Sequence, residues 1–337
     1  MIRIQKGLNL PLAGEPSSDV EAGPAVKHVG LLGDDYVGMK PTMLVREGER
    51  VKLGQPLFAD KKNPGVQFTA PGAGTVKSIV RGEKRKFESI SIELDGDEEE
   101  TFAQYDAGAI GGLERAKVQE NLVASGLWTA FRTRPYSRTP ALDTAPHSIF
   151  VTAMDTRPHA PNPVPLIKER EADFTAGLKT IAQLTDGPVQ LCRQAGQNFQ
   201  VGEATPRDFD GPHPAGLPGT HIHFIAPVSE QRTVWYIGYQ DVIAIGHLFT
   251  TGRLDTTRLV ALSGPVVKRP RLVRTRLGAC ISELTANEVE EGAVRRISGS
   301  VLDGRTADEA RDYLGRFHCQ VSVISDEVPQ PLLGWLA

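Results

Sequence analysis

Two phrases near the N-terminus constrain the fold most, because each combines glycine turns with a short strand pattern. They are VREGERVKLGQPLF, residues 45–58, and APGAGTV, residues 70–76. A further strand pattern, FESISIEL, follows at residues 87–94. Short strands with closely spaced turn signals are typical of small sandwiches and barrels. The sequence therefore predicts a compact β domain over residues 1–100.

The two phrases are similar to the two halves of a biotinyl/lipoyl-like domain, in which a lysine at the intervening hairpin tip carries the prosthetic group. Here the tip reads ADKKNPGVQ, which places Lys61 and Lys62 at that position. Asn63, Pro64 and Gly65 follow at once and rigidify the turn differently from a modified hairpin. We predict that this hairpin carries no covalent lipoyl or biotinyl group.

The middle of the chain, residues 101–256, alternates between helix and strand patterns, which indicates an open α/β sheet. SIFVTAM, PVQLCRQ and GTHIHFIAPV predict strands at residues 148–154, 188–194 and 219–228. Apolar spacing predicts helices at residues 165–185 and 241–252.

The last part, residues 257–337, combines several short strands with one helix start at ISELTANE, residues 281–288. A compact sheet crossed by one helix is a β-grasp-like unit. The predicted fold class is therefore α/β and β multidomain, with three parts.

Composition narrows the function. The net charge of -3 provides no field that would attract nucleic acid. Cys192, Cys280 and Cys319 are far apart and form no C-x-x-C pair, so no zinc site or iron–sulfur cluster is predicted. No apolar stretch reaches the roughly 20 residues that a membrane-spanning helix needs. We expect membrane contact to come through a partner.

Three motifs are candidate sites, and each has a structural alternative. Glycines in GLLGDDYVGMKP, residues 30–41, suit a phosphate loop or close approach to a flat ring. His221 and His223 would share one face of a strand, but no acidic or thiol ligand completes a metal site, so a core or interface role is favoured. The arginines and aromatic rings of AFRTRPYSR, residues 130–138, suit an anionic or aromatic ligand, or form a solvated basic loop.

Four long segments carry a resemblance to a known family. They are IRIQKGLNLPLAGEP, residues 28–76 in full, SGLWTAFRTRPYSR and HPAGLPGTHIHF. The chain resembles the A subunits of the sodium-translocating NADH:quinone oxidoreductase (Nqr) complex, a family related to the C subunit of the Rnf complex and to the flavin subunit of complex I. Family members continue beyond this chain's last residue, so we expect a C-terminal segment to be missing.

The resemblance implies three domains. They are a barrel-sandwich hybrid domain at residues 1–100, a Rossmann-like α/β domain at 101–256, and a β-grasp, soluble-ligand-binding domain at 257–337 that includes the start of the truncated segment. It also implies a non-catalytic, soluble, peripheral subunit on the cytoplasmic side of the inner membrane. Its partners would be the other subunits of a sodium-translocating NADH:ubiquinone reductase, above all an integral-membrane quinone-site subunit.

Cofactor expectations follow from a departure within this resemblance. The complex I relatives hold FMN in a Gly-rich loop, where this chain has GLWTAFRTRPYSR. A loop without those glycines does not let the backbone approach the flavin closely. We therefore expect neither FMN nor NADH to bind, and we expect ubiquinone as the ligand. The alternatives are an autonomous nucleotide- or flavin-using soluble oxidoreductase and a ligand-free assembly scaffold.

The predicted quinone site lies between two loops, residues 32–39 and 131–138. Glycine backbone allows close approach to a flat ring, and aromatic rings and arginines supply stacking and hydrogen-bond donors. A partner-subunit interface is an equally natural use for both loops. No catalytic and no metal-binding residue is predicted. The predicted quinone contacts are Leu32, Gly33, Tyr36, Gly38, Met39, Phe131, Arg134, Tyr136 and Arg138.

Overall fold

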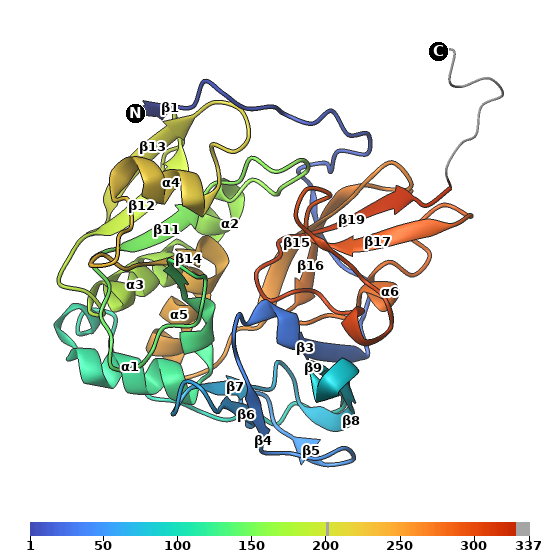
Figure 1. Ribbon diagram of the computed structural model, residues 1–337, viewed down its shortest axis with the longest axis horizontal. Helices are drawn as coiled ribbons and strands as arrows, with labels where there is room; N and C mark the ends of the chain where they lie inside the picture. The colour runs from blue at the N-terminus through green and yellow to red at the C-terminus, as the bar shows by residue number, and fades with distance from the viewer. Residues whose placement is uncertain (200–201, 328–337) are drawn as a thin grey trace.

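The computed structural model describes residues 1–199 and 202–327, and shows three regions built around separate sheets (Figure 1). Residues 328–337, at the end of the predicted part 257–337 that includes the start of the truncated segment, lie outside the described residues. The first region occupies the bottom of the view, the α/β region the left, and the last region the right.

The first region consists of a four-stranded and a three-stranded sheet that enclose one core, as the strand pattern predicts. Phe58 and Phe68 stack in this core with ring centroids 4.6 Å apart, and Phe87 meets Phe58 edge-on. The four-stranded sheet has the order β3 (His28–Leu32), β9 (Phe87–Leu94), β8 (Gly74–Arg81) and β5 (Arg50–Val51). The other has the order β4 (Pro41–Met43), β6 (Pro56–Asp60) and β7 (Gln67–Thr69).

The α/β region has a six-stranded sheet whose strands are parallel except for the edge strand β10. Its order is β1 (Ile2–Arg3), β13 (Thr205–Asp210), β12 (Val189–Gln194), β11 (Ile149–Ala153), β14 (Val234–Gly238) and β10 (Arg132–Arg134). Its helices are α1 (Arg115–Ala124), α2 (Val164–Glu169), α3 (Glu171–Ala182), α4 (Pro218–Ile225) and α5 (Tyr239–Thr251).

Alternate residues of the central strands face different helices, because the side-chain period of a strand is two. Ile149 and Val151 of β11 belong to the core that contains α3 and α5, whereas Phe150 packs in a separate cluster with Ile222 of α4. Helices therefore cover both faces of this sheet (Figure 1).

Glycine lets α3 and α5 pack closely. A Cβ atom on Gly246 would lie 1.7 Å from the carbonyl oxygen of Asp173, and one on Gly177 would lie 2.0 Å from that of Val242. Backbone contact of this kind leaves no space for any side chain. It fixes α5, whose first turn reaches the cavity described below.

The sequence segment 219–228 was predicted as a strand, and this prediction is wrong, because residues 218–225 form α4. The alternation of Thr, His, Ile, His and Phe mimics a strand, but Pro218 occupies the first helical turn, where proline is favoured. His221 is buried and His223 is exposed, so the two imidazoles do not share a face. Among the described residues, no group of His, Cys, Asp and Glu is arranged to hold a metal ion.

The last region is a six-stranded mixed sheet with one short helix, α6 (Ile281–Leu284). Its order is β18 (Arg305–Thr306), β17 (Val294–Ser298), β19 (Gln320–Ser325), β15 (Thr257–Ser263), β16 (Arg271–Arg276) and β2 (Val20–Ala22). The strand β2, like β1 in the α/β sheet, comes from the first 22 residues. These residues were predicted to belong to the first domain, whereas their two strands join the sheets of the other two regions. Edge strands of two and three residues leave no pattern in the sequence that would indicate this pairing.

Candidate functional site

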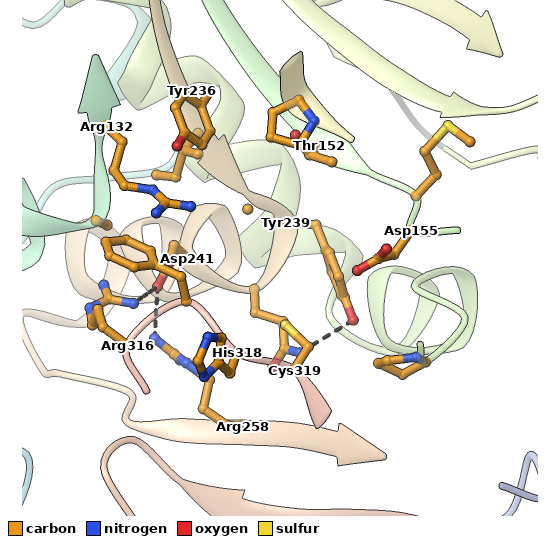
Figure 2. A pocket seen from close by; sticks show the side chains of 18 of the residues that line it. Arg132, Thr152, Asp155, Tyr236, Tyr239, Asp241, Arg258, Arg316, His318 and Cys319 are labelled. Carbon is orange, nitrogen blue, oxygen red and sulfur yellow. Dashed lines mark hydrogen bonds and ion pairs between the residues drawn. The ribbon is translucent and has the colours of Figure 1, made fainter. Parts of the chain in front are cut away.

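The carboxyl ends of β11 and β14 mark the place where an α/β sheet forms a ligand crevice. The chain runs from β11 to β12 and β13 on one side, whereas β14 pairs with β11 on the other. The loops that follow β11 and β14 therefore diverge, and ligands of open α/β sheets bind at such a switch point. A cavity of about 110 Å³ lies there (Figure 2).

Two domains build the wall of this cavity. Met154 and Asp155 follow β11, and Gly238 ends β14 where α5 begins. The segment 316–319, which precedes β19, closes the opposite side from the last region. The volume is of the same order as that of the engineered cavity of about 150 Å³ that binds benzene, so the space suits a small ring.

Arg132 of β10 points into the cavity between two aromatic rings (Figure 2). Its guanidinium carbon lies 4.0 Å from the ring centroid of Phe317 and 4.9 Å from that of Tyr236. Its Nε atom is buried and has no hydrogen-bond partner in the described structure. The hydroxyl of Thr152, which also lines the cavity, is likewise buried and unpartnered there. Two side chains that line the cavity thus each hold a buried polar atom without a hydrogen-bond partner in the described structure.

The floor of the cavity is a buried ion cluster around Asp241, in the first turn of α5. Its Oδ1 accepts hydrogen bonds from Arg258 Nη2 at 2.7 Å and Arg316 Nη1 at 2.8 Å. The backbone N–H of Arg316 donates to Asp35 of the first region at 2.8 Å, and Arg305 pairs with the same carboxylate. All three regions therefore meet at this cluster.

A second ion cluster lies at the mouth of the cavity. Arg157 pairs with Asp155 at 3.0 Å and with Asp303 of the last region at 2.8 Å. These two carboxylates neutralise the Arg157 guanidinium, so Arg157 is not available as a counter-ion for a charged ligand.

The remaining titratable groups of the wall are uncharged at neutral pH. Burial lowers the pKa of His318 to about 4, and its Nδ1 lies 2.8 Å from Ser298 Oγ. Burial raises the pKa of Cys319 to about 12 and raises that of Tyr239 above its ordinary value. A buried ionisable group that lacks an opposite charge favours its neutral form.

A neighbouring cavity of about 200 Å³ shares part of this wall. Asp34, Asp35 and Val37 line it, so the loop 32–39 reaches the site from the first region. The residues common to both cavities are Arg132, Asp155, Arg157, Phe317, His318 and Cys319.

The predicted quinone contacts have unequal accessibility. Phe131 is fully buried and packs between Trp128 and Trp235, with centroids 5.9 and 5.8 Å away. Leu32 and Tyr36 are buried too, and a Cβ atom on Gly33 would collide with the backbone of the first region's core. None of the nine predicted residues lines the cavity of Figure 2.

The two predicted loops nevertheless lie together. A Cβ atom on Gly38 would be 3.4 Å from Arg138 Nε, and the Arg138 guanidinium lies 5.6 Å from the ring centroid of Tyr136. Tyr136 is 73% exposed. Met39 packs partly buried against the core, and Arg134 stacks on the Tyr236 ring at 5.2 Å. The exposed residues of the two loops, Gly38, Tyr136 and Arg138, therefore lie together at the surface.

The predicted contacts do not include Arg132, although the motif AFRTRPYSR contains it. The signal available was an arginine inside an aromatic-rich segment. Its partner Phe317 is distant in the chain, so no local pattern separates Arg132 from Arg134 and Arg138.

Comparison with known proteins identifies relatives along the whole chain. Three family models match: "NqrA N-terminal barrel-sandwich hybrid domain" over residues 2–95, "NqrA second alpha/beta domain" over 113–254, and "NQRA C-terminal domain" over 259–309. The A subunit of the Na(+)-translocating NADH-quinone reductase of Shewanella amazonensis is 52% identical over 336 residues, covering 100% of this chain and 76% of that protein. That of Photorhabdus laumondii is 55% identical over 339 residues, with the same coverage.

Similarity to solved structures is weak. An NAD+-reducing [NiFe]-hydrogenase in the air-oxidized state aligns with a TM-score of 0.43 and 11% identity, covering 66% of this chain and 49% of that one. Similarity at this level supports no argument about function. In the part of the chain that the structure describes, no helix is long and apolar enough to cross a membrane.

Proposed function

Because the chain belongs to the NqrA family, the A subunits of the Na+-translocating NADH-quinone reductase, we propose that it is a peripheral subunit that contributes a quinone-binding cavity to that complex. The redox cofactors reside in partner subunits, and this chain carries no catalytic residue. Its place is the cytoplasmic side of the inner membrane, where it contacts an integral-membrane subunit that shares the quinone site.

The observation that supports this proposal most is the combination of free polar groups with an apolar, aromatic wall. A quinone ring needs one or two hydrogen-bond donors for its carbonyls and apolar contacts for its faces. Arg132 and Thr152 supply the donors. Met154, Ile237 and Tyr236 supply the apolar surface. The ring would lie at the carboxyl ends of β11 and β14.

Each residue has a physical task in this arrangement. Phe317 and Tyr236 hold the Arg132 guanidinium between them, so little side-chain freedom is lost when it donates to a carbonyl oxygen. The Thr152 hydroxyl donates to a second acceptor. The buried Asp241 cluster keeps the segment 316–319 against α5 and thereby fixes the cavity's shape.

The loops 32–39 and 131–138 form the outer part of the site in this proposal. Loop 32–39 reaches the neighbouring cavity through Asp34, Asp35 and Val37. Tyr136 and Arg138 lie exposed beside Gly38, where they are available to the ligand's outer part or to a partner subunit. Buried Phe131 supports the loop from beneath.

We do not expect FMN or NADH to bind at micromolar concentration. The cavity of about 110 Å³ is well below the 300–1,000 Å³ typical of sites for larger ligands. Trp128 and Phe131, in the segment where the resemblance to the flavin subunit of complex I implies a Gly-rich loop, are also buried. Calorimetry with each compound tests this, and saturable micromolar binding of either would favour an autonomous oxidoreductase.

Labelling in the assembled complex tests the proposal directly. A photoreactive short-chain quinone should cross-link to residues 130–138, 152–157, 236–241 or 316–319. Labelling confined to other subunits would contradict a quinone site in this chain and would favour the assembly scaffold.

A matched pair of variants tests the cavity itself. Thr152→Val removes a hydroxyl from the cavity without changing its volume and should weaken quinone binding by about 0.5–1.5 kcal/mol. Thr275→Val is the control, because the Thr275 hydroxyl is also buried and unpartnered in the described structure but lies outside the cavity. Equal quinone affinity in both variants would remove Thr152 from the site.

A further inference from the structure

The charged side chains around the cavity are paired, with one exception. Arg157 pairs with Asp155 and Asp303, and Arg258 and Arg316 both pair with Asp241. In the neighbouring cavity, Asp35 pairs with Arg305 and Asp34 with Lys86. Arg132 is the cation of this wall for which the described structure records no acidic partner within ion-pair distance.

The charge of Arg132 is not removed by its surroundings. Burial lowers its pKa, and the nearby Arg134 lowers it further, yet an arginine side chain stays protonated in proteins. His318, Cys319 and Tyr239 contribute no negative charge at neutral pH. The Arg132 guanidinium therefore faces the cavity as a cation that, in the described structure, forms no ion pair; Asp35 acts on it only from beyond ion-pair distance.

We propose that this cavity selects a flat ring that carries an ionised oxygen, such as an acidic hydroxyquinone, over the neutral quinone, with Arg132 as its counter-ion. The choice of a quinone ring rests on the proposed function, whereas the preference for an anion rests on the charges of the wall alone.

The geometry around Arg132 suits an anionic oxygen on a flat ligand. The guanidinium is a planar fork that donates two parallel hydrogen bonds, and Phe317 and Tyr236 fix its plane. The Thr152 hydroxyl faces the same space and supplies another donor. The positive end of α5, which begins at Tyr239 in the wall, adds to the field that attracts an anion.

The Asp241 cluster explains why the anion would bind at Arg132 rather than deeper in the wall. Arg258 and Arg316 already share one carboxylate oxygen at 2.7 and 2.8 Å. A ligand that replaced this carboxylate would break hydrogen bonds that hold the domains together. Arg132 has no such bond to break, and its Nε is buried and unpartnered in the described structure.

Binding of three small compounds to the purified chain tests the inference. Lawsone is an acidic hydroxynaphthoquinone that is ionised at neutral pH, and its methyl ether is a neutral molecule of nearly the same shape. Benzoate supplies an anionic oxygen on a ring without a quinone. A hydrogen bond to a charged group contributes about ten- to hundredfold in affinity, so lawsone should bind more tightly than its ether by about that factor.

Variants assign the preference to one side chain. Arg132→Met keeps the stem and should reduce the preference for lawsone to near one, whereas Arg132→Lys should keep part of it. Arg207→Met is the matched control, because it removes one positive charge from the same sheet, and neither Arg207 nor its partner Gln190 lines the cavity. Its preference should equal that of the unmodified chain. Thermal unfolding of each variant, compared with that of the unmodified chain, checks that the variant is folded.

The outcomes separate the inference from the proposed function. Equal affinity for lawsone and its ether in the unmodified chain overturns the inference and leaves quinone binding standing; this comparison needs no variant. A preference that survives in Arg132→Met also overturns it. Arg132-dependent binding of benzoate, with no binding of either naphthoquinone, supports the anion site and overturns the quinone proposal. Binding of none of the three overturns both.

Discussion

The hairpin tip of the first region and the cavity at the strand ends are two places where folds of these kinds hold ligands, and they differ in how their polar groups are satisfied. At the tip, Asp60 accepts hydrogen bonds from the backbone N–H groups of Lys40 and Lys62 at 3.1 and 2.9 Å. Asn63 donates to the carbonyl oxygens of Pro140 and Thr139 at 2.9 and 3.4 Å. The hairpin is therefore docked on the α/β region.

The cavity differs because polar atoms remain free beside a paired ion cluster. Arg132 Nε and Thr152 Oγ1 are buried and unpartnered in the described structure, whereas Oδ1 of Asp241, which lines the same cavity, accepts two hydrogen bonds. A buried polar group without a partner is costly unless a ligand or water completes it. The fold indicates both the hairpin tip and the cavity as possible ligand sites. The hydrogen bonds distinguish them, because the polar groups at the tip have partners within the protein, whereas two polar atoms at the cavity have none among the described residues.

The largest expected effect comes from the paired side of the cavity. Asp241→Ala would leave Arg258 and Arg316 buried without a carboxylate, which costs about 3–5 kcal/mol of unfolding free energy. Urea unfolding measures it. Asp186→Ala is the control, because Asp186 pairs with Arg115 on the surface and is 95% exposed. If Asp241→Ala lowered the unfolding free energy by no more than Asp186→Ala, the Asp241 cluster would not be what holds the cavity together.

The fold could be predicted from the sequence where one face of an element is buried. The strands predicted at residues 148–154 and 188–194 are observed at 149–153 and 189–194, and the helix predicted at 241–252 is observed at 239–251. The segment 218–225 was mistaken for a strand because its apolar and polar residues alternate, whereas the helix buries His221 and Ile222 and packs Ile225 in the same cluster, which is helical spacing. Short apolar runs do not distinguish these two structures.

The site could be predicted only in part, because its residues come from distant parts of the chain. Asp35, Asp241 and Arg316 belong to three domains, and no spacing in the sequence connects them. The sequence did indicate the segment 130–138 and the loop 32–39, which the structure brings together at Gly38 and Arg138. Which arginine faces the cavity depends on Phe317, which only the folded chain places beside Arg132.

The next largest effect is a pH dependence that originates in the cavity wall. The pKa of His318 in the folded chain is about 4, below the ordinary value of 6.5, because the ring is buried. The unfolded chain takes up a proton as the pH falls below 6.5, whereas the folded chain does so only near 4. Stability is therefore lost across this window, by about 3 kcal/mol for one such group.

The variant His318→Asn should remove this contribution while keeping a polar partner for Ser298. Its unfolding free energy should fall less steeply between pH 6.5 and 4 than that of the unmodified chain. His221 is also buried, with a pKa lowered to about 4 by burial, so part of the slope remains. The exposed His223 provides the control variant His223→Asn. An unchanged slope in His318→Asn would contradict a buried neutral ring.

A smaller effect is expected at the hairpin. Asn63→Ala removes the hydrogen bonds between the tip and the α/β region and should cost about 1 kcal/mol of unfolding free energy. The neighbouring Lys62→Ala should change little, because the Lys62 side chain is exposed and only its backbone holds the turn. Chemical unfolding of both variants decides. Equal stability would mean that the tip is not docked, which would weaken the contrast with the cavity.

No effect at all is expected from a modifying ligase. Lys61 and Lys62 are exposed, but the turn that presents them is held on both sides, by Asp60 within the hairpin and by Asn63 on the α/β region. Leu142 lies so close to Gly65 that a Cβ atom there would be 2.8 Å from its side chain. A ligase must surround the lysine and its turn, and the docked α/β region blocks that approach.

The chain produced in a host with active lipoyl and biotin ligases should therefore have the intact mass of its bare sequence. The variant with both lysines replaced by arginine should likewise have only the mass of its own bare sequence. A lipoyl or biotinyl mass increment that disappears in this double variant would contradict the prediction. It would show that the hairpin tip undocks and that its hydrogen bonds to the α/β region do not prevent modification of the lysines.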